Sequence, residues 1–351
     1  MTKRTRYFMT GAALVLVAGL GTGLVAYYGG FPALSASKSG PNELSYIPAD
    51  AAVVAYADVH AVMTSQFRQK IHDAMPANEG EGRDEFQQKT GIDLERDIQY
   101  VIAGLGPQVG EPGAGGAGLV LARGNFDTGR LEALAKEHNA RFEEYRGSRL
   151  VIGPINEHPK EPGAAARKGE GAMAFLEPGL VALGDIDSIK RGIDAHSDGK
   201  SVSGNDEMMR LVADIEAGSN AWAVGRFDAL RNRERLPEQV NTQLSAVKWF
   251  AATGHINGGV SGTLRAEARD EPAADNLRDV VRGLLALAKM QGGSDPRAAA
   301  MVQSLQLSGT GKTVVLSFSV PAEVVDLLAG AAKEHRQMRT PEAPKPPTPD
   351  R

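Results

Sequence analysis

A glycine-rich pentapeptide near the C-terminal end is the segment that most resembles a chemical motif. It reads Gly309-Thr310-Gly311-Lys312-Thr313 and ends like the phosphate-binding loop of nucleotide hydrolases. That loop needs another glycine five residues before its Gly-Lys pair, and Gln306 stands there. It must also lead from a strand into a helix, whereas Thr313 begins a strand-like run. We therefore interpret the segment as a hairpin turn, not a nucleotide site.

Two Ser-x-x-Lys sequences match the nucleophile pair of penicillin-recognising enzymes. They lie at 245–248 and 35–38. Such enzymes also need a Ser-x-Asn-type element and a Lys-Thr-Gly strand. The only approach to that strand is Lys312-Thr313, which is followed by Val314, and no second element precedes it. We therefore assign no serine nucleophile from these matches.

The titratable residues form no recognisable metal or catalytic group in the sequence. Seven histidines are scattered, none at zinc-ligand spacing, and the acidic cluster at 79–85 lacks calcium-loop spacing. Asp58 and His60 share a strand face, and we interpret them as a solvated strand end. Arg265, Glu267 and Arg269 fit a ligand-binding surface and cross-strand charge pairs on a wet sheet face equally well. We assign no catalytic, cofactor-binding or metal-binding residue, and no cofactor.

The first half of the chain reads as alternating strands and helices. After the first strand, Val62, Phe67, Ile71 and Met75 lie near helical spacing and predict an amphipathic helix. A later helix takes Asp127 as its N-cap. Pro178-Gly179 and Gly147-Ser148 predict tight turns. The predicted strands are 52–59, 98–105, 118–122, 142–145, 149–153, 172–176 and 180–183, the later helices are 128–138, 187–195 and 206–215, and 153–171 is predicted to be a long surface loop.

The second half restarts with a strand at 220–227. Asn257-Gly258 is a strong hairpin signal between strands predicted at 247–256 and 259–268. The outgoing strand alternates from Val260 to Ala268, which predicts one buried and one wet face. A helix opening at Pro272 carries a broad apolar stripe from Leu277 to Met290. A second hairpin joins 303–308 to 313–320, and a further helix is predicted from 321 to about 332.

The two halves look like one pattern used twice. The segment Ala55-Tyr56-Ala57-Asp58 corresponds to Ala221-Trp222-Ala223-Val224, and a helix follows in both. The segment from Gly115 to Asp127 corresponds to that from Gly258 to Asp270, again followed by a helix. The sequence therefore predicts an internal duplication.

Composition bounds the folded part and excludes several classes of site. About 290 residues remain without the terminal segments, enough for one large or two ordinary domains. Hydrophobic and charged contents of 42% and 23% are ordinary for a folded protein. The net charge of −4 provides no basic surface for nucleic acid. With no cysteine, disulfides, thiolate metal sites and thiol catalysis are excluded.

The first thirty residues predict where the protein works. An uncharged, mostly apolar run extends from Met9 to Tyr28, and about 20 such residues span a bilayer as a helix. Lys3, Arg4 and Arg6 precede it, so the positive-inside rule places the N-terminus in the cytoplasm and the rest outside. The run is either a retained anchor or a long signal peptide, because small residues at 33–36 offer a cleavage site.

Three segments carry a resemblance to a known family. They are Ile47 to Ala52 before a strand, Thr90 to Leu94, and the strand from Gly258 to Arg269 with its long helix. They resemble a family of uncharacterised bacterial membrane-anchored proteins with a large exported α+β region. The resemblance covers most of residues 45–330. It implies a fold and a location, and it carries no catalytic residue.

These observations lead to an α+β protein of two related halves. Antiparallel sheets are expected to be covered by helices mainly on one face, after one N-terminal transmembrane helix. The expected organisation is an anchor or signal segment at 1–30, a tether at 31–44, α+β halves at 45–215 and 216–335, and a proline-rich tail at 336–351.

The expected function is a non-catalytic structural or binding module outside the cytoplasmic membrane. Its partners are the membrane, through the N-terminal helix, and an unknown protein or lipid, but not nucleic acid. One variant carries an apolar ligand between sheet and helices. The alternative is an envelope hydrolase whose site is assembled from distant segments, and Asp58, His60 and a serine within hydrogen-bond reach would favour it.

Overall fold

The computed structural model describes residues 41–66, 87–107, 118–157, 167–227, 246–256, 259–292 and 302–320. The strands are β1 Val53–Asp58, β2 Ile98–Leu105, β3 Leu119–Gly124, β4 Arg141–Tyr145, β5 Ser148–Glu157, β6 Arg167–Glu177, β7 Leu180–Gly184, β8 Ala221–Arg226, β9 Val247–Ile256, β10 Val260–Ala268, β11 Gln306–Ser308 and β12 Thr313–Val320. The helices are η1 Asn42–Tyr46, α2 Val59–Met63, α5 Thr128–Glu137, α6 Ile186–Asp198, η2 Val202–Gly204, α7 Asp206–Ala213 and α9 Glu271–Gly292.

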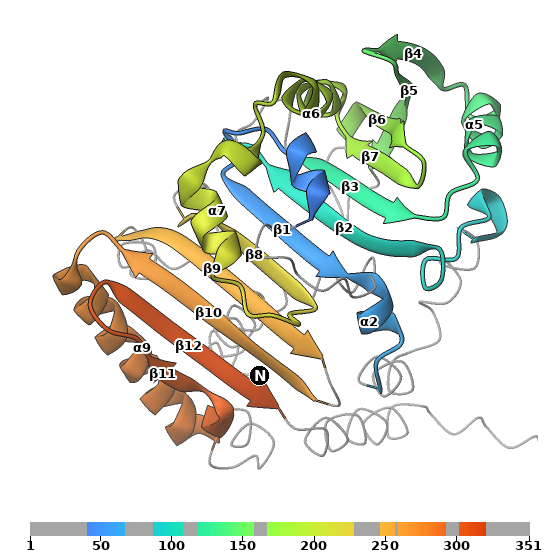
Figure 1. The fold of residues 1–351 in the computed structure, drawn as a ribbon. Coiled ribbons are helices and arrows are strands. Elements are labelled where there is room, and N and C mark those ends of the chain that lie inside the picture. The colour runs from blue at the N-terminus through green and yellow to red at the C-terminus, as the bar shows by residue number, and fades with distance from the viewer. Residues whose placement is uncertain are drawn as a thin grey trace, which may run out of the picture.

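All of these strands belong to one twelve-stranded antiparallel sheet (Figure 1). The order is β11-β12-β10-β9-β8-β1-β2-β3-β7-β6-β5-β4. The two halves meet where β1 pairs with β8, in a register that places Ala55 opposite Ala223. The protein is thus a mixed α/β structure, dominated by strands, with a continuous sheet.

The strand order repeats on the two sides of the β1–β8 pair. The series β1-β2-β3-β7-β6 runs one way and β8-β9-β10-β12-β11 runs the other, while β5 and β4 extend only the first. An extra residue interrupts the pairing near the start of β2 at Gln99 and near the start of β9 at Lys248. Such bulges bend a strand locally, so both series bend at the same place.

Helices lie on both faces of the sheet. One face holds Leu119, and α6 approaches it so closely that a Cβ on Gly192 would lie 2.6 Å from a Leu119 methyl carbon. On the opposite face, α9 packs Leu277 against Ala268 and Val314. The expectation of helices mainly on one face is therefore corrected for α9, whose apolar side chains pack on the face away from α6 and α7.

Several local predictions are confirmed by side-chain and backbone geometry. Asp127 caps α5 by accepting the Arg130 N–H at 3.0 Å. Gly179 has φ +74 in the turn between β6 and β7, a conformation open to glycine. The turn before β5 is centred on Arg146 and Gly147, both with positive φ, and not on Gly147-Ser148.

The predicted surface loop at 153–171 is partly wrong. β5 continues to Glu157 and β6 begins at Arg167, and their ladder runs from Gly153 opposite Gly171 to Glu157 opposite Arg167. Prediction of a strand from sequence depends on an alternating apolar pattern. A ladder of backbone hydrogen bonds has no such requirement, so glycine-rich residues here join the sheet.

The structure describes helix residues inside the predicted tether at 31–44. Residues 42–44 belong to η1, and Leu44 is only 1% exposed. The segment is too short to show a helical period, so its residue pattern predicts no helix. Of the helix predicted after the first strand, α2 ends at Met63, while Phe67, Ile71 and Met75 lie outside the described residues, as does Asn257-Gly258.

Burial in the second half is less sharply divided than predicted. Along β10, only Gly262 and Ala268 are buried, and the other side chains on both faces are half-exposed. Along α9, Leu277 is buried but Leu284 is 53% exposed. Among the described helices, none combines the length and hydropathy needed to cross a bilayer.

Substitution of Gly225 tests the junction between the halves. A Cβ on Gly225 would lie 2.5 Å from the Ala52 carbonyl oxygen and 2.8 Å from the Val53 Cα, and backbone atoms cannot yield cheaply. We expect Gly225→Ala to lower the free energy of unfolding by about 1–3 kcal/mol. The measurement is denaturant unfolding of the full chain.

Gly254→Ala is the matched control in the adjacent strand. Its Cβ would meet nothing nearer than the Ala221 carbonyl oxygen at 3.9 Å, so the change should cost less than about 0.5 kcal/mol. Equal effects of the two substitutions would contradict close pairing of β1 with β8.

Candidate functional site

A row of polar side chains crosses the first half of the sheet. Asp58 on β1 is paired with Tyr100 on β2, which is paired with Arg123 on β3. Through Leu180 on β7 the row reaches Glu177 at the end of β6. Direct cross-strand partners project on the same face, so β pairing alone brings these groups together from distant parts of the chain.

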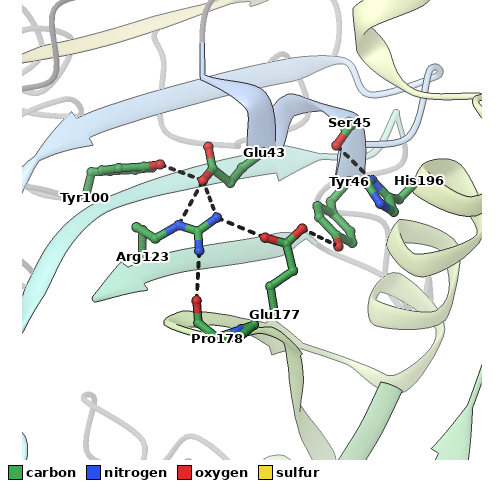
Figure 2. A network of polar contacts seen from close by, with 8 residues as sticks. All are labelled: Glu43, Ser45, Tyr46, Tyr100, Arg123, Glu177, Pro178 and His196. Atoms are coloured by element: carbon green, nitrogen blue, oxygen red, sulfur yellow. Dashed lines mark hydrogen bonds and ion pairs between the residues drawn. The ribbon is translucent and has the colours of Figure 1, made fainter. Parts of the chain in front are cut away.

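The helix η1 places a carboxylate over this row. Glu43 is 5% exposed, and one of its oxygens, Oε1, accepts three hydrogen bonds. The donors are the Tyr100 hydroxyl at 2.6 Å and the Arg123 Nε and Nη2 atoms at 2.9 and 2.6 Å (Figure 2). Leu44, buried beside it, holds η1 against the sheet. A buried charge needs such pairing to be tolerated.

The remaining donors of Arg123 are also engaged. Nη2 approaches Glu177 at 3.3 Å and Nη1 donates to the Pro178 carbonyl oxygen at 3.1 Å. The second oxygen of Glu177 accepts the Tyr46 hydroxyl at 3.0 Å (Figure 2). All three guanidinium nitrogens are therefore used by the protein itself, and the cluster links η1 to strands β2, β3 and β6.

Burial and hydrogen bonding raise the pKa values of the two tyrosines and the arginine of this cluster. Burial, together with the hydrogen bond to Glu177, raises the pKa of Tyr46 to about 12. Burial and the bond to Glu43 also raise the pKa of Tyr100. Burial alone would lower the pKa of Arg123, but its bonds to Glu43 and Tyr100 outweigh this and raise it. The phenols remain neutral donors and the arginine remains a cation.

A serine and a histidine meet beside this cluster. Ser45 Oγ lies 2.9 Å from His196 Nδ1, and the Tyr46 and His196 rings stack with centroids 4.0 Å apart (Figure 2). When a histidine activates a serine nucleophile, a third group orients the imidazole through its other ring nitrogen. Among the residues that the structure describes, none forms a hydrogen bond with His196 Nε2. The contact fastens η1 to α6.

Asp58 is buried and not the solvated strand end that the sequence predicts. Its side chain accepts the Ala61 N–H at 2.9 Å and caps α2, while the residue is 1% exposed. His60 is exposed as expected. Within the described part of the chain, no hydrogen bond joins Asp58 to His60 or to a serine. Burial raises the pKa of Asp58 to about 7.

The glycine-rich pentapeptide is a turn, as predicted. Thr313 begins β12, and the carbonyl oxygens of Gly311 and Thr313 accept hydrogen bonds from Arg278. A phosphate loop would instead direct its N–H groups inward. The segment presents acceptors to a cation, which is the reverse of phosphate binding.

The charges on β10 pair with a helix and not across strands. Arg265 contacts Asp214 at 2.9 Å and Glu267 contacts Arg210 at 3.0 Å. The cross-strand interpretation is therefore wrong, because α7 lies over this face. Ser245 and the acidic cluster at 79–85 lie outside the described residues. In the described ranges, no group of histidines and carboxylates has metal-binding geometry.

A small crevice lies where β2 ends and β3 begins. Its volume is about 20 Å³, room for about one water. The ion pair of Asp50 with Arg191, at 2.6 Å, lies on its rim. Its size fits solvent and not an organic substrate.

Comparisons with known proteins leave these observations as the basis for function. No protein-family profile, curated protein or solved structure matches this chain.

Removal of Arg123 tests the energetic role of the cluster. Arg123→Met leaves the buried Glu43 carboxylate without its counter-ion, which should lower the free energy of unfolding by about 3 kcal/mol. The double variant Glu43→Gln/Arg123→Met removes both charges and should recover part of this loss. Both are measured by denaturant unfolding of the full chain.

An exposed ion pair supplies the control. Arg141 contacts Glu170 at 2.9 Å, with the two side chains 55% and 54% exposed. Arg141→Met should therefore cost less than about 1 kcal/mol. A similar loss for both single arginine variants would contradict a special role for Arg123.

Because the pKa of Asp58 is raised in the folded state, we expect the free energy of unfolding to fall between acid and neutral pH. The folded carboxyl keeps its proton up to about pH 7, whereas the ordinary value is 3.8. Across this window the folded state binds more protons, so stability decreases as pH rises. Asp58→Asn retains an acceptor for the Ala61 N–H and removes this decrease, worth about 4 kcal/mol at most.

The measurement is unfolding free energy as a function of pH for the wild type and Asp58→Asn. Asp127→Asn is the control, because it removes the carboxylate of another N-cap, that of α5, at an exposed site. It separates the effect of burying the carboxyl group from the effect of capping a helix. A pH profile of Asp58→Asn parallel to that of the wild type would refute the assignment.

Proposed function

We propose that this chain is a single-pass envelope protein whose folded region is a non-catalytic binding module outside the cytoplasmic membrane. The run from Met9 to Tyr28, preceded by Lys3, Arg4 and Arg6, supports an N-terminus inside and the folded region outside. The resemblance to membrane-anchored bacterial proteins with an exported α+β region supports the same location. The unknown partner is a protein or a lipid.

The observation that carries the binding role is the continuous twelve-stranded sheet, whose polar row is paired internally through Arg123. Arg123 contacts Glu43 and Glu177, so the charged side chains of the row stabilise η1 on the sheet. This arrangement rigidifies a broad platform. A rigid sheet that presents loops and helix surfaces suits recognition of a partner.

The module consists of two related halves. The repeated strand order and the bulges at Gln99 and Lys248 support this proposal. When the two bulges are aligned, Tyr100 is equivalent to Trp249, and Ala55 on β1 is equivalent to Ala223 on β8. The sequence comparison instead matched Ala55 with Ala221, two residues earlier. The β1–β8 pair then lies on an approximate two-fold axis, as in a dimer formed by one chain.

Two other readings have less support. A carried apolar ligand needs space between sheet and helices, and the layer beneath η1, α6 and α7 is packed with fully buried side chains that include Leu44, Ile189 and Met208. The hydrolase alternative rests on a serine brought to Asp58 and His60, whereas Asp58 caps α2. Ser45 and His196 do meet, without an orienting group from the described residues.

Membrane topology is the direct test of the proposal. The chain has no cysteine, so single cysteines can be placed at Thr2 and Ser39 and labelled in cells with an impermeant maleimide. We expect Ser39→Cys to be labelled in intact cells whose outer barrier is permeabilised, and Thr2→Cys only after lysis. The full chain should remain in the membrane pellet after alkaline washing.

Mass spectrometry of the mature protein separates the two readings of the first segment. A retained anchor gives the intact N-terminus, whereas cleavage gives a chain that begins near Ser35 or Ala36. Ser39→Cys that is labelled only after lysis would contradict an exported module altogether.

A further inference from the structure

The described residues include two buried carboxyl groups, and only one of them has a cation beside it. Glu43 is 5% exposed and forms an ion pair with Arg123 at 2.6 Å. Asp58 is 1% exposed. Among the residues that the structure describes, its side chain has one hydrogen-bond partner, the Ala61 N–H. A buried carboxylate without a cation is costly, so the folded state favours a neutral Asp58.

The groups around Asp58 offer no charge that would compensate its ionisation. Its cross-strand partner on β2 is Tyr100, whose hydroxyl donates to Glu43. On the β8 side, the Asn220 carbonyl oxygen accepts the Asp58 N–H at 2.7 Å. The titratable and charged groups that neighbour it from η1, α2, β2, β3 and β9 are Glu43, His60, Tyr100, Arg123 and His255. Within the described ranges, none of them forms a hydrogen bond or ion pair with the Asp58 carboxyl group. Burial therefore outweighs the bond from Ala61 and raises the pKa of Asp58 to about 7.

Asp58 stands at the joint between a fixed strand and a short helix. It is the last residue of β1 and the N-cap of α2. A five-residue helix has too few internal hydrogen bonds to be stable alone, so α2 depends on its cap and on the burial of Val59 and Val62. β1, by contrast, is paired on both sides, with β2 and β8. Water is therefore expected to reach Asp58 through movement of α2, because local opening costs less than global unfolding.

Other aspartate caps in the described chain are open to water or better paired. Asp127 caps α5 and Asp270 caps the start of α9, and both are exposed. Asp185 caps α6 and accepts a second hydrogen bond, from Ser188 Oγ. Ionisation at these sites needs no rearrangement, since water or a second donor already solvates the carboxylate. Among these caps, only Asp58 would lose its proton in a dry site.

We propose that α2 is a proton-controlled latch, closed against β2 while Asp58 is neutral and released when Asp58 loses its proton. In the open state water solvates the carboxylate, so opening and proton release are linked. Below the ordinary pKa of 3.8 both states hold the proton, and above a pKa of about 7 both release it. Between these values only the closed state holds it, so the opening constant rises by about tenfold per pH unit. The latch adds regulation to the module and does not depend on the location proposed for it.

Hydrogen exchange of the full chain between about pH 5 and pH 7 measures this opening directly. Exchange of a peptide that covers α2 is divided by the intrinsic chemical rate at each pH, and peptides from β2 and β8 report global unfolding. Asp58→Asn retains an acceptor for the Ala61 N–H and cannot ionise, and Asp58→Ser is a second N-cap without charge. Asp127→Asn is the matched control, because it changes an aspartate cap that is open to water.

We expect the opening constant of α2 to rise about 50-fold from about pH 5 to pH 7 in the wild type and in Asp127→Asn, because the steep rise is halved where the closed state begins to ionise. In both Asp58 variants it should change less than about twofold. A rise that is absent from the wild type, or that persists in the Asp58 variants, would overturn the latch. An equal rise in β2 and β8 would overturn it in favour of global unfolding. Should neither Asp58 variant fold, the wild-type comparison of α2 with β2 and β8 still decides between the two.

Discussion

The pairing of β1 with β8 is the constraint on which the rest of the structure depends. It joins two strand series that would otherwise end in open edges, which are prone to pair with other chains. The pairing is close: Gly225 lies against the backbone of Ala52 and Val53, and Ala55 faces Ala223. On one face of this seam the side chains are small, as at Ala55 and Ala223, and there the backbone ladder defines the register. On the face that α6 and α7 cover, the stacked rings of Tyr56 and Trp222, with centroids 5.6 Å apart, strengthen the β1–β8 pairing.

The polar cluster beneath η1 follows from this sheet. Pairing of β2 with β3 sets Tyr100 beside Arg123, and the buried Glu43 completes the ion pair. The cost of burying these charges is offset by mutual hydrogen bonds, so the cluster specifies where η1 sits. On the second half, the ion pairs of Arg210 and Arg265 with Glu267 and Asp214 link α7 to the sheet in the same way.

Local features were predictable because their causes are local. The bounds of β2 and β9 match the apolar runs at 98–105 and 247–256, and Asp127 caps a helix through a contact three residues away. The contact of Glu43 with Arg123 spans 80 residues, and nothing in either neighbourhood indicates the partner. Glu43 stands in a segment with the composition of a tether. The burial of Asp58 was hidden for the same reason, since its neighbours in the sheet, Tyr100 and Asn220, are distant in sequence.

Hydrogen exchange of the full chain in lipid, measured with increasing denaturant, tests the central claim that the two halves form one platform. Peptides from β1 and β2 report the first half, and peptides from β8 and β9 report the second. The account predicts that all four strands lose protection in one transition with a common midpoint, because the β1–β8 pair makes the sheet a single cooperative unit. Separate midpoints for β1–β2 and β8–β9 would show two independent domains and contradict it.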